Sequence, residues 1–208
     1  MRKITTIIIG FLLALPMLAN NAKVSVLTCA PGNEAYALYG HTGLRYCDNA
    51  RGVDVVFNYG YFDFSSPNFI WRFILGETDY MVGAVPYDVF CQEYLQRDSG
   101  IFGQELELTP EQARRLYYLL VENCLPVNRT YRYNYFYNNC TTKARDIIEA
   151  AVAPDGEIKY ATTEECPTFR DVVHRFTEVS PWYTFGIDLL LGYEADIRQD
   201  ARTLQFIP

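Results

Sequence analysis

Residues 137–151 have the sequence Tyr-Asn-Asn-Cys-Thr-Thr-Lys-Ala-Arg-Asp-Ile-Ile-Glu-Ala-Ala. This pattern predicts a helix that begins at Cys140, because either Asn138 or Asn139 can cap its N-terminus. A cysteine at such a position is a candidate thiolate, since the unpaired N–H groups and the dipole of a helix N-terminus favour its anionic form. The backbone N–H of Cys140 can also donate to an oxyanion that forms beside the sulfur. The stretch therefore predicts a helix that presents a reactive thiol.

A second stretch, Tyr-Gly-His-Thr-Gly-Leu-Arg-Tyr at residues 39–46, contains one of the two histidines of the chain. A histidine can act as the base for a thiol nucleophile. We therefore expect the imidazole of His41 to lie within roughly 3–4 Å of the Cys140 sulfur. These two residues are the candidate base and nucleophile of a thiol enzyme.

A hairpin is predicted around this histidine. Residues 41–47 alternate in polarity and residues 53–59 are apolar and β-branched, so the two runs are expected to pair. Asn58 then lies beside the imidazole and is the candidate residue that orients it. Tyr59 and Asp63, further along the chain, are the alternatives.

Each of these residues also has a simpler interpretation. A single cysteine before a helix is more often structural than catalytic, and a single histidine at a strand edge usually only packs. His174, in a predicted helix, is expected to have such a role and to lie far from Cys140 and His41. The tyrosine-rich run at residues 131–137 is most simply an amphipathic strand beside the core.

The rest of the chain predicts an α+β protein with a mainly antiparallel sheet. Thr109, Pro110 and Gln112 form a capping box, so a helix is expected at residues 110–124. An aromatic and aliphatic run occupies residues 180–192. The other strands are expected at residues 24–29, 80–85 and 101–108, and the other helices at 69–75, 86–96 and 168–177.

The N-terminus has the features of an export signal. Two basic residues precede an apolar run from Ile4 to Leu18, and small and polar residues follow. We therefore expect residues 1–22 to be a secretory signal peptide and residues 23–208 to form one exported domain. Thr28 precedes Cys29 where a lipidation site needs Gly, Ala or Ser, so we expect no lipid anchor on the exported chain.

Composition argues against several classes of function. The net charge of −7 argues against nucleic acid as a partner, because nucleic-acid binding needs a basic surface. We expect no metal and no cofactor, since the histidines are far apart and both a Cys-x-x-Cys spacing and a glycine-rich phosphate loop are missing. No apolar stretch after the signal is long enough to span a membrane. Among the six cysteines, Cys29 and Cys47 are the first expected disulfide pair; the alternative for each cysteine is burial as a small apolar side chain.

Four stretches taken together resemble one family. They are Leu-Thr-Cys-Ala-Pro-Gly-Asn-Glu at 27–34, Tyr-Gly-His-Thr-Gly-Leu-Arg at 39–45, Asn-Tyr-Gly-Tyr-Phe-Asp-Phe at 58–64 and Tyr-Asn-Asn-Cys-Thr-Thr-Lys-Ala-Arg-Asp at 137–146. In this order they are similar to the periplasmic N-terminal domain of the Lnb lipoprotein N-acyltransferases of Bacteroides-like bacteria. The resemblance implies a circularly permuted papain-like (NlpC-type) fold, in which the histidine strand precedes the cysteine helix and an antiparallel sheet packs on that helix.

The resemblance also implies a function. The family's cysteine and histidine correspond to Cys140 and His41, whereas Asn58 rests on the predicted hairpin alone. The implied activity is thiol acyl transfer from a membrane phospholipid, through a cysteine thioester, to the N-terminal amine of a diacylglyceryl lipoprotein. The implied location is the periplasm, at the membrane surface and facing the inner membrane. Members of this family continue into a membrane-embedded C-terminal part, whereas this sequence ends at Pro208.

Two other functions compete with acyl transfer. An NlpC-type cysteine peptidase or amidase would use the same thiol on cell-wall peptides. A non-enzymatic envelope domain would keep the fold and bind lipid or a partner. Acyl transfer predicts an apolar groove to the cysteine, lined by aromatic residues from 131–137 or 182–185, whereas a peptidase predicts an open polar cleft.

Overall fold

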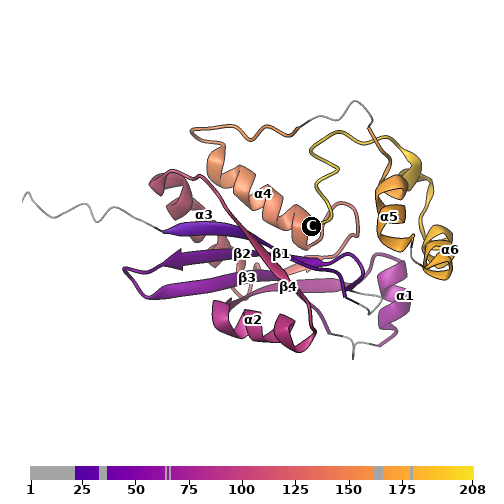
Figure 1. The fold of residues 1–208 in the computed structure, drawn as a ribbon, viewed down its shortest axis with the longest axis horizontal. Coiled ribbons are helices and arrows are strands. Elements are labelled where there is room, and N and C mark those ends of the chain that lie inside the picture. The colour runs from indigo at the N-terminus through magenta and orange to yellow at the C-terminus, as the bar shows by residue number, and fades with distance from the viewer. Residues whose placement is uncertain (1–21, 33–36, 64, 66, 162–165, 179) are drawn as a thin grey trace, which may run out of the picture.

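The structure of the protein is a computed structural model, which describes residues 22–32, 37–63, 65, 67–161, 166–178 and 180–208. Apart from Ala22, the predicted signal peptide lies outside the described residues. Figure 1 shows a twisted sheet with helices on both of its faces and a further group of helices at one end.

An antiparallel sheet of six strands forms the centre of the fold, in the order β5-β1-β2-β3-β4-β6. The strands are β1 (Lys23–Cys29), β2 (His41–Asp48), β3 (Val53–Tyr61), β4 (Asp79–Pro86), β5 (Ile101–Glu105) and β6 (Thr130–Arg132). The predicted hairpin is confirmed, because β2 pairs with β3 in a register that places Gly43 opposite Asn58. The sheet and its helices also confirm the predicted α+β class.

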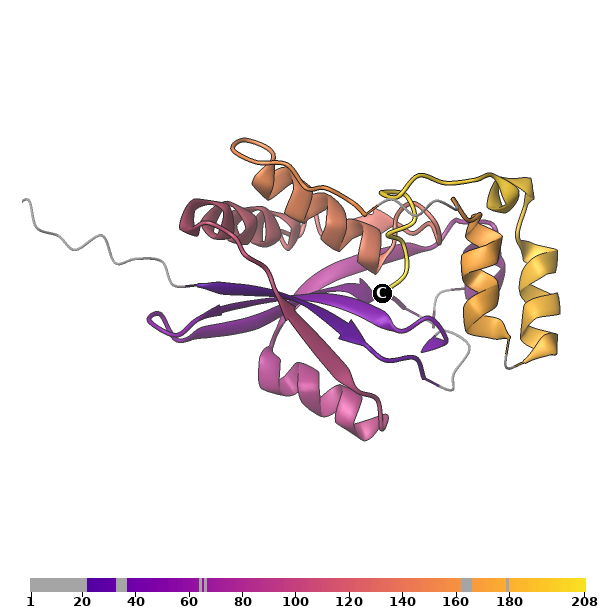
Figure 2. The ribbon, with the colours of Figure 1, turned by 45° about the horizontal axis from the view of Figure 1, so that its top comes forward.

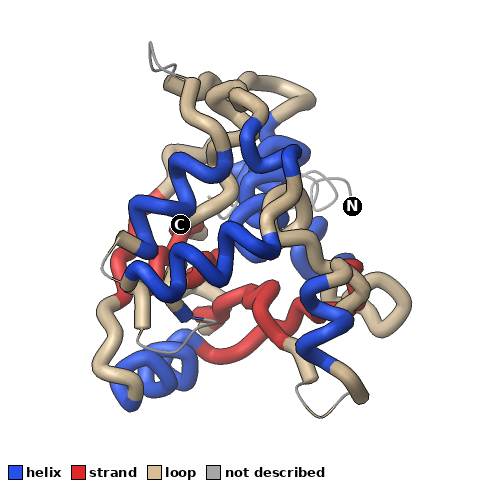
Figure 3. The backbone as a smooth tube through the Cα atoms, turned by 90° about the vertical axis from the view of Figure 1, so that its right-hand side faces the viewer, coloured by secondary structure: helices blue, strands red, loops and turns tan. Residues whose placement is uncertain are grey.

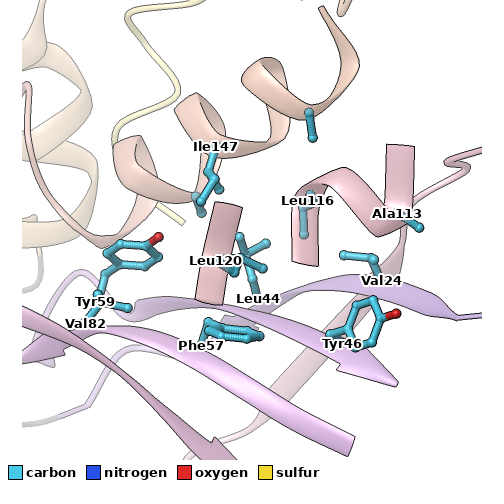
Figure 4. Packing of buried hydrophobic residues seen from close by; sticks show 12 residues of the cluster. Val24, Leu44, Tyr46, Phe57, Tyr59, Val82, Ala113, Leu116, Leu120 and Ile147 are labelled. Carbon is cyan, nitrogen blue, oxygen red and sulfur yellow. The ribbon is translucent and has the colours of Figure 1, made fainter. Parts of the chain in front are cut away.

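The helices form layers on the sheet. They are α1 (Phe69–Ile74), α2 (Tyr87–Gln96), α3 (Pro110–Asn123), α4 (Cys140–Val152), α5 (Phe169–Thr177) and α6 (Pro181–Leu190), followed by the short 3-10 helix η2 (Tyr193–Asp196). Helices α3 and α4 cover one face, and α2 covers the other (Figure 2). The main core lies beneath α3 and α4 (Figure 4), where Leu44 and Phe57 of the sheet meet Leu116, Leu120 and Ile147. Each side chain buried in this way contributes about 1.5–3 kcal/mol.

A second, smaller core lies at the end of the molecule that faces the viewer in Figure 3. Phe169 and Val173 of α5 are buried there against Ala195 and Phe206. Helices α1 and α6 lie at the same end as α5 (Figures 1 and 3). This end is built from segments that are distant in the sequence.

The capping predictions are confirmed. Thr109 and Gln112 form a reciprocal capping box with Pro110 in the first turn of α3. Of the two candidates for the cap of α4, Asn139 is the one used. Thr168 caps α5 in the same reciprocal manner.

The strand predicted at residues 131–137 is wrong beyond Arg132, where β6 ends. Oδ1 of Asn134 accepts hydrogen bonds from the N–H groups of Phe136 and Tyr137. Such a side-chain contact to the following backbone turns the chain. The alternation of tyrosines therefore belongs to a short strand and a turn rather than to one strand. The strand predicted to reach residue 108 also ends earlier, at Glu105.

The expected disulfide between Cys29 and Cys47 is also wrong. The register of β1 on β2 places Cys29 opposite His41, and Cys47 opposite Lys23 at the other end of the pair. Six residues of extended chain separate these positions, or about 20 Å, whereas the Cα atoms of a disulfide lie within about 7 Å. All six cysteines are described, and all are free thiols.

Candidate active site

One buried side chain, Asn139, fixes the start of α4. Its Oδ1 accepts hydrogen bonds from the N–H groups of Thr141 and Thr142. Its Nδ2 donates to the backbone oxygens of Tyr135, at 2.7 Å, and Phe206, at 2.9 Å. The cap thus ties the first turn of the helix to the preceding turn and to the C-terminal segment.

His41, the first residue of β2, is held by the neighbouring strand. Its Nε2 lies 2.7 Å from Oδ1 of Asn58, which also accepts the N–H of Gly60 at 2.8 Å. Because this oxygen only accepts, Nε2 must donate, and Nδ1 of the neutral imidazole is left free to take up a proton. Glycine is required at position 60, since a Cβ there would lie 2.6 Å from Cε1 of His41.

Helix α4 meets β2 at a pair of threonines. The hydroxyl groups of Thr42 and Thr141 are hydrogen-bonded at 2.8 Å. Next to this contact, the thiol of Cys140 and the imidazole of His41 lie close enough for each to shift the pKa of the other. The structure therefore brings together Cys140, His41 and Asn58, the three residues singled out from the sequence, whose roles in catalysis stay a prediction.

The thiol and the imidazole shift each other's protonation. Burial by itself raises the pKa of Cys140, but the charge of His41 and hydrogen bonds with His41 and the Thr42 backbone outweigh it and lower this pKa to about 7. Burial by itself lowers the pKa of His41, but the negative sulfur and the bond to Asn58 bring it above its ordinary value. Both shifts act in the direction of a thiolate–imidazolium pair.

The other candidates from the sequence have different partners. The hydroxyl of Tyr59 accepts a hydrogen bond from Asn123, and Asp63 accepts from Ser65 in an exposed turn. Neither of these hydrogen bonds is to the imidazole of His41. Nε2 of His174 is bonded at 2.8 Å to Asp188 of α6.

Three tyrosines lie near the sulfur, and one of them, Tyr80, is outside the stretches that the sequence connects with the site. Burial raises the pKa of Tyr80, Tyr131 and Tyr133, and the negative charge of Cys140 raises each further, which places all three phenols near the sulfur. The hydroxyl of Tyr131 donates to the backbone oxygen of Tyr59. Tyr80 comes from β4, so only the paired sheet could connect it with the cysteine helix.

The site has donors suited to a developing negative charge. Within the described residues, the backbone N–H of Cys140 has no acceptor. The hydroxyl groups of Tyr80 and Tyr133 are further donors near the sulfur. Hydrogen-bond donors beside a nucleophilic sulfur can stabilise the oxyanion of a tetrahedral intermediate.

The groove predicted to lead to the cysteine stays a prediction. Two surface hollows, one beside Glu149 and Gly156 and one beside Cys166 and Arg198, do not include Cys140. Of the run 131–137, Tyr131 packs against the same core as Cys140. Residues 182–185, the other predicted lining, lie on α6, which buries no side chain completely.

A family model described as the Lnb N-terminal periplasmic domain matches residues 17–175. The chain belongs to this family. The match includes Cys140, His41 and Asn58 and ends before α6, and the family places this part of the Lnb-type protein in the periplasm. No curated protein and no solved structure matched the chain.

Two negative findings apply to the described residues only. None of the helices there is long and apolar enough to cross a membrane. No group of three or more His, Cys, Asp or Glu side chains in the same residues is arranged to hold a metal ion.

Proposed function

We propose that this Lnb-type protein is a thiol acyltransferase that faces the inner membrane. It takes an acyl chain from a phospholipid onto Cys140 and passes it to the N-terminal amine of a diacylglyceryl lipoprotein. The observation that carries this proposal is the cluster at the start of a capped helix, where His41 is hydrogen-bonded to Asn58 and lowers the pKa of Cys140. The order of the histidine strand and the cysteine helix supports a circularly permuted papain-like fold of the NlpC type.

In the first half of the reaction, the Cys140 thiolate attacks the carbonyl carbon of a phospholipid ester. A C–S bond forms, and the backbone N–H of Cys140 stabilises the oxyanion. The C–O bond then breaks, and the imidazolium of His41 gives its proton to the leaving oxygen of the lysophospholipid. The products are a neutral imidazole and an acyl-thioester on Cys140.

In the second half, the neutral N-terminal amine of the lipoprotein attacks the thioester carbonyl. His41 takes the proton that the amine loses, and the C–S bond breaks as the amide forms. The thiolate–imidazolium pair is thereby restored. Neither half of the reaction needs a metal or a cofactor.

The surroundings of the sulfur favour acyl transfer over hydrolysis. A thioester survives until the amine arrives only if water is kept away. The aromatic rings of Tyr80 and Tyr133 stack at 4.2 Å beside the site, and that of Phe73 stacks on Tyr133 at 5.6 Å. This lining is apolar and suits an acyl chain, because each buried CH₂ contributes about 0.8 kcal/mol.

Mass spectrometry of the protein after incubation with phosphatidylethanolamine vesicles tests the proposal. We expect the peptide that contains Cys140 to gain the mass of one acyl group, which hydroxylamine removes. A synthetic diacylglyceryl peptide with a free N-terminal amine should then remove the adduct and gain an amide-linked acyl chain. Cys140→Ala should form no adduct, whereas Cys166→Ala, which removes an exposed thiol, should behave like the wild type.

The two competing functions give different results in the same experiment. Cleavage of a cell-wall peptide without any acyl adduct would show a cysteine peptidase or amidase. If the protein binds phospholipid but forms no acyl adduct and cleaves no peptide, it is a non-enzymatic domain. Either result would overturn the acyltransferase proposal.

A further inference from the structure

Helix α6 has its polar groups on the inside and its large apolar groups on the outside. Thr184 donates to the backbone oxygen of Thr177 at 3.0 Å, and Ile187 packs on the core that α5 buries. On the opposite side, Trp182, Phe185 and Leu189 are exposed. These three residues follow the spacing of one helix face, so α6 presents a row of large apolar side chains to the outside.

The single charge on α6 also points inward. Asp188 accepts from Arg170 at 2.6 Å and from His174 at 2.8 Å, which satisfies its carboxylate on the side of α5. A lone carboxylate on the outer face would oppose any contact with an apolar phase. Here the ion pairs leave the exposed side of the helix without charge.

Helix α1 lies at the same end of the molecule as α6 (Figure 1) and also exposes large apolar side chains. Trp71 and Leu75 are 67% and 66% exposed, close to the 71% of Leu189 on α6. The guanidinium of Arg72 donates to the backbone oxygen of Glu77 at 2.8 Å, and its remaining N–H groups can donate to a lipid phosphate. We call Trp71, Leu75, Trp182, Phe185 and Leu189 the aromatic end.

We infer that the aromatic end docks on the surface of a phospholipid bilayer. Groups of exposed large apolar side chains mark interaction sites. Tryptophan rings favour the headgroup level of a membrane. Helix α6 has 10 residues, half the length needed to span, so it lies in the plane of the interface. The row of apolar side chains on α6 matches the apolar boundary region of a bilayer, and the net charge of −7 argues against general attraction to anionic lipid as the driving force.

The aromatic end continues into the candidate active site. Phe73 belongs to α1 and stacks on Tyr133 at 5.6 Å, and Tyr133 lies close to the Cys140 sulfur. A lipid held at α1 therefore lies next to the aromatic lining of the thiol. Delivery of a bound lipid to Cys140 rests on the proposed function. Binding of the aromatic end to a bilayer does not require any acyl transfer.

Tryptophan fluorescence tests the inference directly, because the two tryptophans of the chain are Trp71 and Trp182. The full chain is expressed, the exported protein is purified, and its intact mass shows whether residues 1–22 have been removed. Vesicles of phosphatidylcholine and phosphatidylethanolamine are then added. We expect the emission of both tryptophans to move to shorter wavelength and to be quenched by brominated acyl chains, at low and at high salt. Trp71→Phe and Trp182→Phe report on each helix separately.

Charge substitutions provide the matched control. Leu189→Asp should weaken co-sedimentation with the vesicles by about tenfold or more, because a carboxylate opposes insertion at the interface. The control is Leu95→Asp on α2, because Leu95 is 75% exposed and Leu189 is 71% exposed. This variant should bind vesicles like the wild type. Cys140→Ala should also bind like the wild type, which separates docking from chemistry. Circular dichroism of each variant checks that the fold is intact.

Three results would overturn the inference. The first is an unchanged tryptophan emission in the presence of vesicles. The second is an equal loss of binding in Leu95→Asp and Leu189→Asp, which would show adsorption without a defined face. The third is a dimeric mass with both tryptophans already shielded before vesicles are added, which would assign the aromatic end to a second copy of the chain.

Discussion

The carboxamide oxygen of Asn58 accepts a hydrogen bond from Nε2 of His41 at 2.7 Å. The backbone N–H of Gly60 donates to the same oxygen, so the orientation of the amide is fixed by the main chain. The bond leaves Nδ1 as the only nitrogen of the neutral ring that can accept a proton. Asn58 therefore positions the proposed base without contacting the sulfur.

Replacing Asn58 should slow the proposed acylation. Asn58→Ala removes a hydrogen bond to a group that is charged in the resting pair, and such bonds contribute about 1.5–3 kcal/mol. We expect the rate of thioester formation to fall about 10- to 100-fold, as measured by the mass of the acyl adduct over time. Asn123→Ala removes a carboxamide that bonds to Tyr59 instead and should keep the wild-type rate. Equal rates in both variants would show that the imidazole is oriented by something else.

Gly60 should tolerate no side chain. The Cβ of Gly60→Ala would lie 2.6 Å from Cε1 of His41, so the ring must leave its place between Asn58 and Cys140. We expect acylation to be lost while the far-ultraviolet circular dichroism is unchanged. Gly103→Ala places its Cβ at an ordinary 3.5 Å from Leu27 and provides the strand-glycine control. Full activity of Gly60→Ala would contradict the packing of the imidazole.

The reactivity of Cys140 should depend on pH with a midpoint near its pKa of about 7. The thiolate is the reactive form. Alkylation by iodoacetamide should therefore be constant above that pH and fall about tenfold per unit below it. In His41→Ala the charge that lowers the pKa is gone, so the midpoint should move to a higher pH. Because the two groups are coupled, the measured midpoints belong to the pair, and an unchanged midpoint in His41→Ala would disprove the pairing.

Local patterns in the sequence predicted much of this site. Polar alternation placed His41 on a strand, and the hairpin placed Asn58 on the next strand. The asparagines before Cys140 predicted the start of its helix. Each of these predictions depends on residues within one or two neighbouring elements, where turn and cap chemistry decide the outcome.

The remaining features depend on contacts that no local pattern contains. Tyr80 lies near the sulfur because its strand, β4, is paired between β3 and β6. The two cysteines of the expected disulfide, Cys29 and Cys47, flank His41 in the sequence, but the antiparallel register separates them. The sequence also could not predict which face of α6 is exposed, since an aromatic and aliphatic run alone does not show which side a helix buries.

The cap of α4 gives the last prediction, because Asn139 joins three parts of the chain. Asn139→Ala removes a helix cap, which costs about 1 kcal/mol. It also leaves the backbone oxygens of Tyr135 and Phe206 without their donor, at about 1–3 kcal/mol for a buried group. We expect a total loss of about 2–4 kcal/mol in the free energy of unfolding, measured by urea denaturation. Thr109→Ala removes only the cap of α3 and should cost about 1 kcal/mol. An equal cost in both variants would show that Asn139 is a cap and nothing more. If the larger cost is found, the same substitution should also slow alkylation of Cys140 in the folded protein, because the first turn of α4 is no longer tied to the C-terminal segment.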